Sequence, residues 1–153
     1  MNIIVIPDGA MIVIPLIEKN GHTYLSPTGF SKQNNTDICD GNLKFNNLNN
    51  KYITSEAPSG VKSRIFLFSK VVDRADACII IDKTGYNSKM YGALNQLIMF
   101  GSSSCKNAHS LMLKIVKDLN IPTLTLQYPQ NQKELIELIN TTNKFLKGLK
   151  NVN

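Results

Sequence analysis

Short apolar runs alternate along the chain with longer segments in which apolar residues recur at helical spacing. The clearest runs are Ile3–Ile6 and Ala77–Asp82, the second of which ends in a carboxylate. Continuous apolar runs of this length are typical of strands buried on both faces of a parallel sheet. Shorter runs at His22–Leu25, Tyr52–Thr54 and Thr123–Leu126 predict three further strands.

The segments between these runs have the periodicity of amphipathic helices. Helices are predicted over 61–75, 88–99 and 104–119, and a last one follows the turn at 128–130. The residues predicted to face the core are Val61, Ile65, Phe68 and Val72 in the first, Leu111, Ile115, Val116 and Leu119 in the third, and Leu135, Leu138, Ile139, Thr142 and Leu146 in the last.

The segment after the first strand is ambiguous. Met11–Ile14 is β-branched and apolar, but Asn20-Gly21 resembles a helix C-terminus. We predict a helix from about Gly9 to Asn20 with Asp8 as its N-cap. Pro15 argues against this helix because proline in a helix interior removes a backbone hydrogen bond.

Strands that alternate with helices predict one α/β domain over residues 1–153. The expected architecture is a doubly wound, mainly parallel sheet with helices on both faces, which is a Rossmann-like arrangement of three layers. Residues 26–51 are rich in asparagine and lack periodicity, so they are predicted to form a polar loop excursion.

Composition limits the kind of partner. The 42% of apolar residues suits a globular domain, and the net charge of +6 comes from lysines that form no block, so there is no clear nucleic-acid signal. The three cysteines form no CxxC pair, which favours a reducing compartment. The N-terminus has no basic signal-peptide region and no apolar run is long enough for a bilayer, so we expect a cytoplasmic protein without a membrane partner.

Polar side chains follow three predicted strands where those strands end. Asp8, Asp82 and Tyr128 take these positions, and ligands of doubly wound sheets bind at the carboxyl ends of the strands. Paired carboxylates there could bind a metal or act as acid and base. The simpler alternative is that Asp8 caps a helix and that Asp82 marks where a buried strand meets water. Cys78, inside the apolar run, is predicted to be core.

A second candidate is the small-residue turn before the third helix. A helix N-terminus offers free N–H groups to an anion, and the residues that could bind one here are Gly101, Ser102, Ser103, Ser104 and Lys106. The sequence contains neither GxxxxGK[ST] nor GxGxxG. The alternative is an ordinary capping turn in which Ser103 or Ser104 is the cap.

Cys105 and His109 are four residues apart and would share a helix face, which is half of a metal site. Cys105 could instead be a thiolate with a lowered pKa at the helix N-terminus. The alternative is a buried structural cysteine and a surface histidine. The apolar 88–99 segment is either core or an interface, so a homo-oligomer is expected.

Three stretches, at 57–64, 100–105 and 121–129, resemble the methanogenesis marker protein 5 family of methane-producing archaea. The resemblance implies a cytoplasmic archaeal protein associated with methanogenesis and without an established activity. The family pattern has a cysteine pair, but this chain has Ser102 where the partner of Cys105 would fall, which weakens a redox or iron–sulfur role. The remaining candidates for binding an anion or an acidic partner are Pro58, Ser59, Gly60 and Arg64.

These observations lead to a functional expectation without an identified cofactor. We expect an accessory or small-ligand-binding role in methanogenesis, such as cofactor or enzyme maturation with a partner enzyme, and a small anionic ligand would fit the turns. The alternatives are an enzyme that acts on a small anionic substrate at the strand ends, or a metal-binding module. No complete catalytic set is visible in the sequence, which argues against an enzyme.

Overall fold

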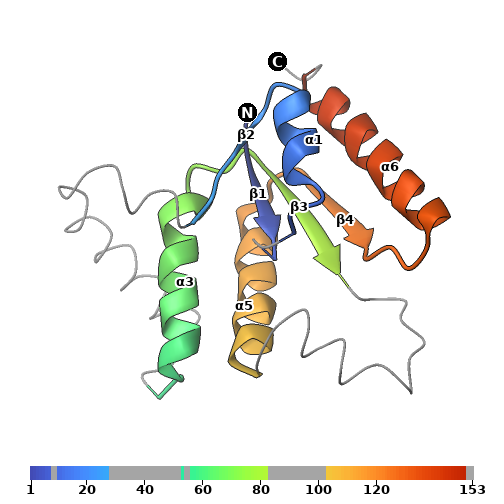
Figure 1. Cartoon of the computed structure of the whole chain (residues 1–153). Coiled ribbons are helices and arrows are strands. Elements are labelled where there is room, and N and C mark those ends of the chain that lie inside the picture. Colours follow the sequence, from blue (N-terminus) through green and yellow to red (C-terminus); the bar gives the residue numbers. More distant parts are fainter. Residues whose placement is uncertain (8–9, 28–52, 54–55, 83–102, 151–153) are drawn as a thin grey trace. The chain divides into compact units, whose positions relative to one another are not determined.

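The structure is a computed structural model that describes residues 1–7, 10–27, 53, 56–82 and 103–150 (Figure 1). The predicted strand at 52–54 and the predicted helix at 88–99 lie wholly or largely outside these residues, as does the asparagine-rich excursion. Contacts divide the chain into two compact units. One contains the four described strands with helices α1 and α6, and the other contains helices α3 and α5.

The strands of the first unit form a parallel four-stranded sheet in the order β2-β1-β3-β4. Their bounds are Asn2–Ile6 for β1, Thr23–Tyr24 for β2, Ala77–Asp82 for β3 and Thr123–Gln127 for β4. The predicted α/β class with a Rossmann-like parallel sheet is confirmed.

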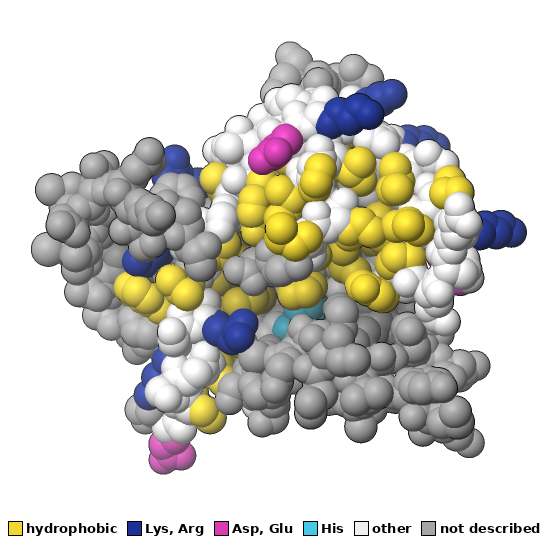
Figure 2. All heavy atoms as spheres, in the orientation of Figure 1, with side chains coloured by type: hydrophobic (Ala, Val, Ile, Leu, Met, Phe, Trp, Pro, Cys, Tyr) yellow, Lys and Arg dark blue, Asp and Glu magenta, His cyan; other side chains and the backbone are white. Residues whose placement is uncertain are grey.

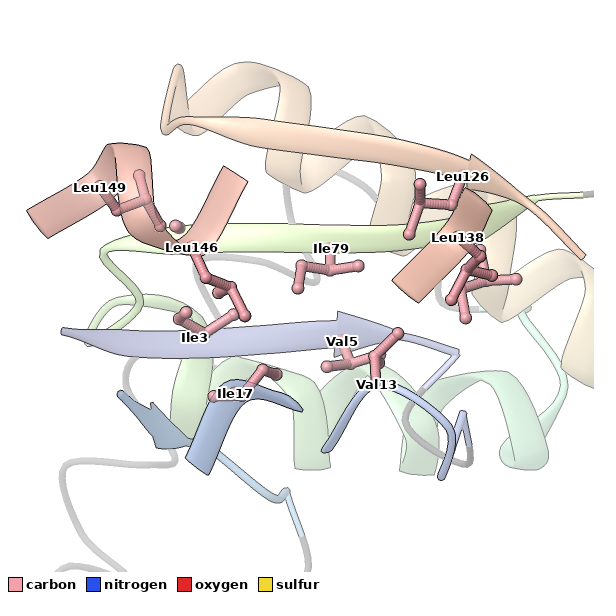
Figure 3. Close-up of a cluster of buried hydrophobic side chains, with 11 residues drawn as sticks. Ile3, Val5, Val13, Ile17, Ile79, Leu126, Leu138, Leu146 and Leu149 are labelled. Carbon is pink, nitrogen blue, oxygen red and sulfur yellow. The ribbon is translucent and has the colours of Figure 1, made fainter. Parts of the chain in front are cut away.

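The two central strands are buried on both faces. Ile3, Val5 and Ile79 contribute to one apolar cluster together with residues of α1 and α6 (Figure 3). The alternate residues of β1 and β3 are also buried, namely Ile4, Ile6, Cys78 and Ile80. This burial explains why both strands appear in the sequence as continuous apolar runs.

Helix α1 (Ile14–Lys19) is shorter than predicted. It begins at Ile14 with Val13 as N-cap, so the predicted start near Gly9 with Asp8 as N-cap is wrong. Pro15 explains the difference, because it lies in the first turn, where a missing N–H costs no helical hydrogen bond.

The end of α1 is a glycine-stabilised turn. Gly21 has a φ of 75°, and the amide of His22 donates to the carbonyl of Ile17 over 3.1 Å. This is the hydrogen bond of a Schellman motif, which returns the chain toward β2.

Helix α6 (Gln132–Lys150) covers the same face of the sheet as α1. Its buried residues include Leu138, Thr142, Leu146 and Leu149. Leu135 and Ile139 are half-buried, so the predicted stripe is largely confirmed. The Oγ1 atom of Thr142 donates to the carbonyl of Leu138 over 2.7 Å, which satisfies this fully buried hydroxyl.

Two hydrogen bonds join the C-terminal parts of α1 and α6. The Nδ2 atom of Asn20 donates to the Oδ1 atom of Asn143 over 2.8 Å. The Nε2 atom of His22 lies 2.9 Å from the carbonyl oxygen of Leu146, so this ring nitrogen carries the donated hydrogen. The two helices lie close together at these ends and diverge toward their N-terminal ends (Figure 1).

The second unit contains α3 (Ser59–Val72) and α5 (Ser103–Leu119), which pack against each other. All four residues predicted to form the inner stripe of α3 are buried: Val61, Ile65, Phe68 and Val72. In α5, Ile115 and Val116 are buried, whereas Leu119 is 38% exposed.

Candidate functional site

The order of the strands identifies the place where the first unit is suited to a ligand. From β1 the chain moves to β2 on one side, returns to β3 on the other side, and continues outward to β4. The direction of winding therefore changes between β1 and β3. In sheets wound in this way, ligands bind at the carboxyl ends of the two strands that flank this point.

The carboxyl ends of these strands are close in register. Ile6 of β1 pairs with Ile80 of β3, and Asp82 at the end of β3 pairs with Gln127 at the end of β4. Asp82 and Tyr128 therefore emerge at the same edge of the sheet, which we call the carboxyl edge. This confirms the placement of Asp82 and Tyr128 at strand ends, although the side chain of Asp82 lies outside the described part of the structure.

Beyond β1, one backbone hydrogen bond joins the described residues on either side of positions 8–9. The Ile6–Pro7 peptide bond is cis, and the amide of Ala10 donates to the carbonyl of Pro7 over 3.1 Å. Asp8 lies outside the described residues. Met11 comes shortly after this hydrogen bond and has 72% of its surface exposed, which is ordinary for a single apolar side chain.

The other side of the carboxyl edge leads into α6. Tyr128 is 48% exposed and comes directly after β4. The Oδ1 atom of Asn131 accepts the amide hydrogen of Glu134 over 2.9 Å, and Glu134 in turn accepts the amide hydrogen of Gln130 over 2.8 Å. This reciprocal cap fills the start of α6 with the protein's own carboxylate, which leaves it poorly suited to a ligand anion.

The candidates in the second unit have a different environment. Ser59, Gly60 and Arg64 lie in the first turns of α3 and are exposed. Pro58 is the N-cap, and its carbonyl accepts hydrogen bonds from the amides of Val61 and Lys62. These three residues thus belong to a solvent-exposed helix start, and their role in binding an anion stays a prediction.

The small-residue turn before α5 is only partly described. Gly101 and Ser102 lie outside the described residues, and α5 begins at Ser103. The side chains of Ser103, Ser104, Cys105 and Lys106 also lie outside them. The predicted anion site at this turn therefore stays a prediction.

His109 differs from the expectation of a surface histidine, because only 7% of it is exposed. Within the described part of the chain, no group of three or more histidine, cysteine and acidic side chains is arranged to hold a metal ion. The side chain of Cys105 lies outside that part, so a metal site built on Cys105 and His109 stays a prediction.

Cys78 is a core residue, as predicted. Its side chain is fully buried in β3, and burial raises the pKa of the thiol from 9.0 to about 12. A thiol with so high a pKa carries almost no thiolate at neutral pH, which excludes it as a nucleophile there.

Two features of the first unit were missed in the sequence. The motif Asn131-x-x-Glu134 was a readable capping signal. The hydrogen bonds from Asn20 and His22 to α6 connect residues more than a hundred positions apart, and no local pattern predicts such a pairing.

Two comparisons relate this chain to archaeal proteins. The chain is 30% identical over 162 residues to an uncharacterised protein of Methanocaldococcus jannaschii, covering 96% of this chain and 94% of that protein. No solved structure matches the chain. Among the helices that the structure describes, none has the length and apolar character to cross a membrane.

A family model matches residues 1–149, which is nearly the whole chain. The family is described as "Uncharacterized protein conserved in archaea (DUF2112)". Because this match and the relative both extend across the sheet, both described units and the carboxyl edge, the chain belongs to this archaeal family.

Proposed function

We propose that this protein binds a small polar molecule at the carboxyl edge, between the ends of β1, β3 and β4. The observation that carries the proposal is the strand order, which changes direction between β1 and β3. The pairing of β3 with β4 supports Asp82 and Tyr128 as ligand contacts, since Asp82 is the last residue of β3 and Tyr128 directly follows β4.

The chemistry of the carboxyl edge favours one class of ligand. A carboxylate accepts hydrogen bonds from hydroxyl and amino groups, and the ring of Tyr128 offers an exposed flat surface. The start of α6 is already occupied by Glu134. A ligand with hydroxyl or amino groups and a flat ring therefore fits these residues better than a bare anion does.

Native mass spectrometry of freshly purified, anaerobically handled protein tests this proposal first. We expect the wild type to retain a small noncovalently bound molecule, seen as extra mass in the native spectrum, and Asp82→Asn to lose it. Glu18→Gln is the matched control, because Glu18 is an exposed acid of α1 in the same unit. It should retain the same mass.

Titration with a defined probe gives a second, independent readout. Adenosine carries hydroxyl groups, an amino group and a flat ring, and AMP adds an anion to the same scaffold. We expect adenosine to bind at least as tightly as AMP, and Tyr128→Ala to weaken adenosine binding about tenfold, the loss of one base–aromatic stack. If no small mass is retained and neither probe gives binding heat, the carboxyl edge is not a ligand site.

We further propose that this binding serves an accessory role in methanogen metabolism, such as cofactor or enzyme maturation. The relative from the methanogen M. jannaschii supports this proposal. Anaerobic affinity purification from a methanogen extract tests it, with an unrelated protein of equal net charge as control. Specific recovery of an enzyme of methane formation is expected, and recovery of the same proteins as with the control would contradict the proposal.

A further inference from the structure

Strand β4 lies at one edge of the sheet, and none of the strands that the structure describes pairs with its outer side. The amide of Cys78 in β3 donates to the carbonyl of Pro122 over 2.9 Å, so this carbonyl points toward β3. Backbone groups alternate in direction along a strand. The residues of β4 that turn their N–H and C=O groups to the outer side are therefore Thr123, Thr125 and Gln127.

This edge lacks the features that usually keep an edge strand from pairing. Proteins protect such edges with charged side chains, proline, bulges or very short strands. Strand β4 has the sequence TLTLQ and pairs with β3 in a regular register, and no charged residue occurs between Asp118 and Lys133. The opposite edge strand, β2, is only two residues long. Of the two edges, β4 is therefore the one suited to pair with a further strand.

The sequence of β4 is self-complementary when two copies of the strand pair antiparallel. A two-fold axis perpendicular to the sheet at Thr125, the middle residue of β4, places Thr125 opposite its own copy. Leu124 then lies opposite Leu126 of the partner subunit, and Thr123 lies opposite Gln127 of the partner subunit. Opposite residues of antiparallel strands share a face, so leucine meets leucine and polar side chains meet polar ones. Thr125 and its copy exchange two backbone hydrogen bonds, because both turn their N–H and C=O groups outward.

The leucines of β4 belong to the face of the sheet that α1 and α6 cover. Leu138 and Leu146 of α6 join the apolar cluster with Ile3 and Ile79 of the central strands (Figure 3). Leu124, at the border of this cluster, is only half-buried. Apolar side chains gather over the region of α1 and α6 in Figure 2. Because the axis is perpendicular to the sheet, both copies present this same face, and the strand pairing buries the apolar border of each against the other.

We propose that this protein forms a homodimer in which the two β4 strands pair antiparallel about Thr125 and join the two sheets into one. The assembly closes at two copies, because the pairing uses both β4 edges and leaves only the short β2 strands at the ends. A strand pair of five residues is smaller than a standard interface. The dimer is therefore in equilibrium with the monomer and depends on protein concentration. This proposal does not rest on ligand binding at the carboxyl edge.

Sedimentation velocity over a wide range of protein concentration tests the pairing. We expect the wild type to shift from monomer to dimer as the concentration rises. Thr125→Pro should raise the dissociation constant about tenfold or more, because proline removes the outward N–H groups at the axis and leaves the bonds to β3 intact. Thr125→Val is the matched control, since it keeps the N–H group and the β-branched shape, and it should leave the constant unchanged. A wild type that stays monomeric throughout, or a dimer that Thr125→Pro does not weaken, would overturn the proposal.

Cysteine cross-linking locates the axis, and it decides the question if Thr125→Pro does not fold. In Thr125→Cys each new thiol faces its own copy, and the Cα atoms of such a hydrogen-bonded pair are about 5.5 Å apart, within the reach of a disulfide. Thr123→Cys is the control, because its own copy lies four residues out of register, roughly 14 Å away along the strands. Both variants also carry Cys39→Ser and Cys105→Ser, so the buried Cys78 is the remaining native thiol.

The two cross-linking variants should differ clearly in rate. We expect mild oxidation to convert Thr125→Cys into a covalent dimer at least about tenfold faster than Thr123→Cys, because only the first pair of thiols lies within reach. Equal rates, or faster linking in Thr123→Cys, would overturn the axis at Thr125. A complex whose mass is not a multiple of this chain would show a strand of another protein on β4 and would overturn the homodimer.

Discussion

Cys78 is the second residue of β3 and lies fully buried, next in the chain to Ile79 of the apolar cluster. Its thiol must stay neutral there, because burial disfavours the thiolate and raises the pKa from 9.0 to about 12. The thiol is therefore a small apolar group of the core at neutral pH. Between pH 9.0 and about 12 it releases its proton only in the unfolded chain.

The stability of the protein should accordingly depend on this thiol at high pH. Below pH 9.0 the thiol is protonated in both the folded and the unfolded state, so it does not change the free energy of unfolding with pH. Between pH 9.0 and about 12 only the unfolded chain releases the proton, which favours unfolding. The free energy of unfolding should fall by about 1.4 kcal/mol per pH unit from this group alone.

Urea unfolding at increasing pH measures this slope, and Cys78→Ala isolates it. Lysines and tyrosines titrate in the same range, but they are common to both proteins and cancel in the difference. The wild type should lose stability more steeply than the variant above pH 9.0. Parallel curves would show that the thiol reaches solvent in the folded protein.

His22 has a structural role of a different kind. Only 6% of it is exposed, and its Nε2–H group donates to the carbonyl of Leu146 over 2.9 Å. His22→Ala removes this hydrogen bond and leaves a cavity between β2 and α6, so we expect a loss of about 2 kcal/mol in the free energy of unfolding. Thr23→Ala is the control, since the neighbouring Thr23 is exposed, and a change no larger than that of the control would contradict the role of His22.

At the scale of helices and strands, the sequence patterns correctly predicted the features that depend on residues close together in the chain. The stripe Val61, Ile65, Phe68 and Val72 was correct in every position because helical spacing directly determines which side chains share a face. The start of α1 was misplaced because the apolar run before Pro15 satisfies helix and strand patterns equally, and only the position of proline within the first turn separates them. At the candidate site, the strand ends were predictable from the local sequence. The arrangement of side chains around them was not, because it depends on segments distant in the sequence.

The cap of α6 offers a test at this scale. Asn131 accepts the amide hydrogen of Glu134, and its Nδ2 atom donates to the Oε1 atom of Glu134 over 2.8 Å. Asn131→Ala leaves this amide without a protein acceptor and should cost about 1 kcal/mol of stability. Gln132→Ala, an exposed change in the same turn, is the control and should cost much less in chemical denaturation. Equal effects would mean that helix propensity, and not the cap, decides the start of α6.

At the scale of the whole molecule, the two compact units alternate along the chain. Helix α3 lies between β2 and β3 in sequence, and α5 lies between β3 and β4. Each helix of the second unit is therefore tied at both ends to strands of the first. The single domain predicted from the sequence requires that the two units lose their structure together.

A substitution in the centre of the sheet tests whether the two units unfold together as one cooperative domain or separately. Ile79 is fully buried in β3, and Ile79→Ala should cost about 3 kcal/mol because a cavity remains. In a single cooperative domain, hydrogen exchange in α3 and α5 reports global unfolding and accelerates by the same free energy as exchange in β1 and β3. Thr125→Ala, at an exposed position of the neighbouring strand, should leave exchange nearly unchanged everywhere. If α3 and α5 keep wild-type exchange in Ile79→Ala, they fold as a separate unit, and the connections in sequence do not couple their stability to that of the sheet.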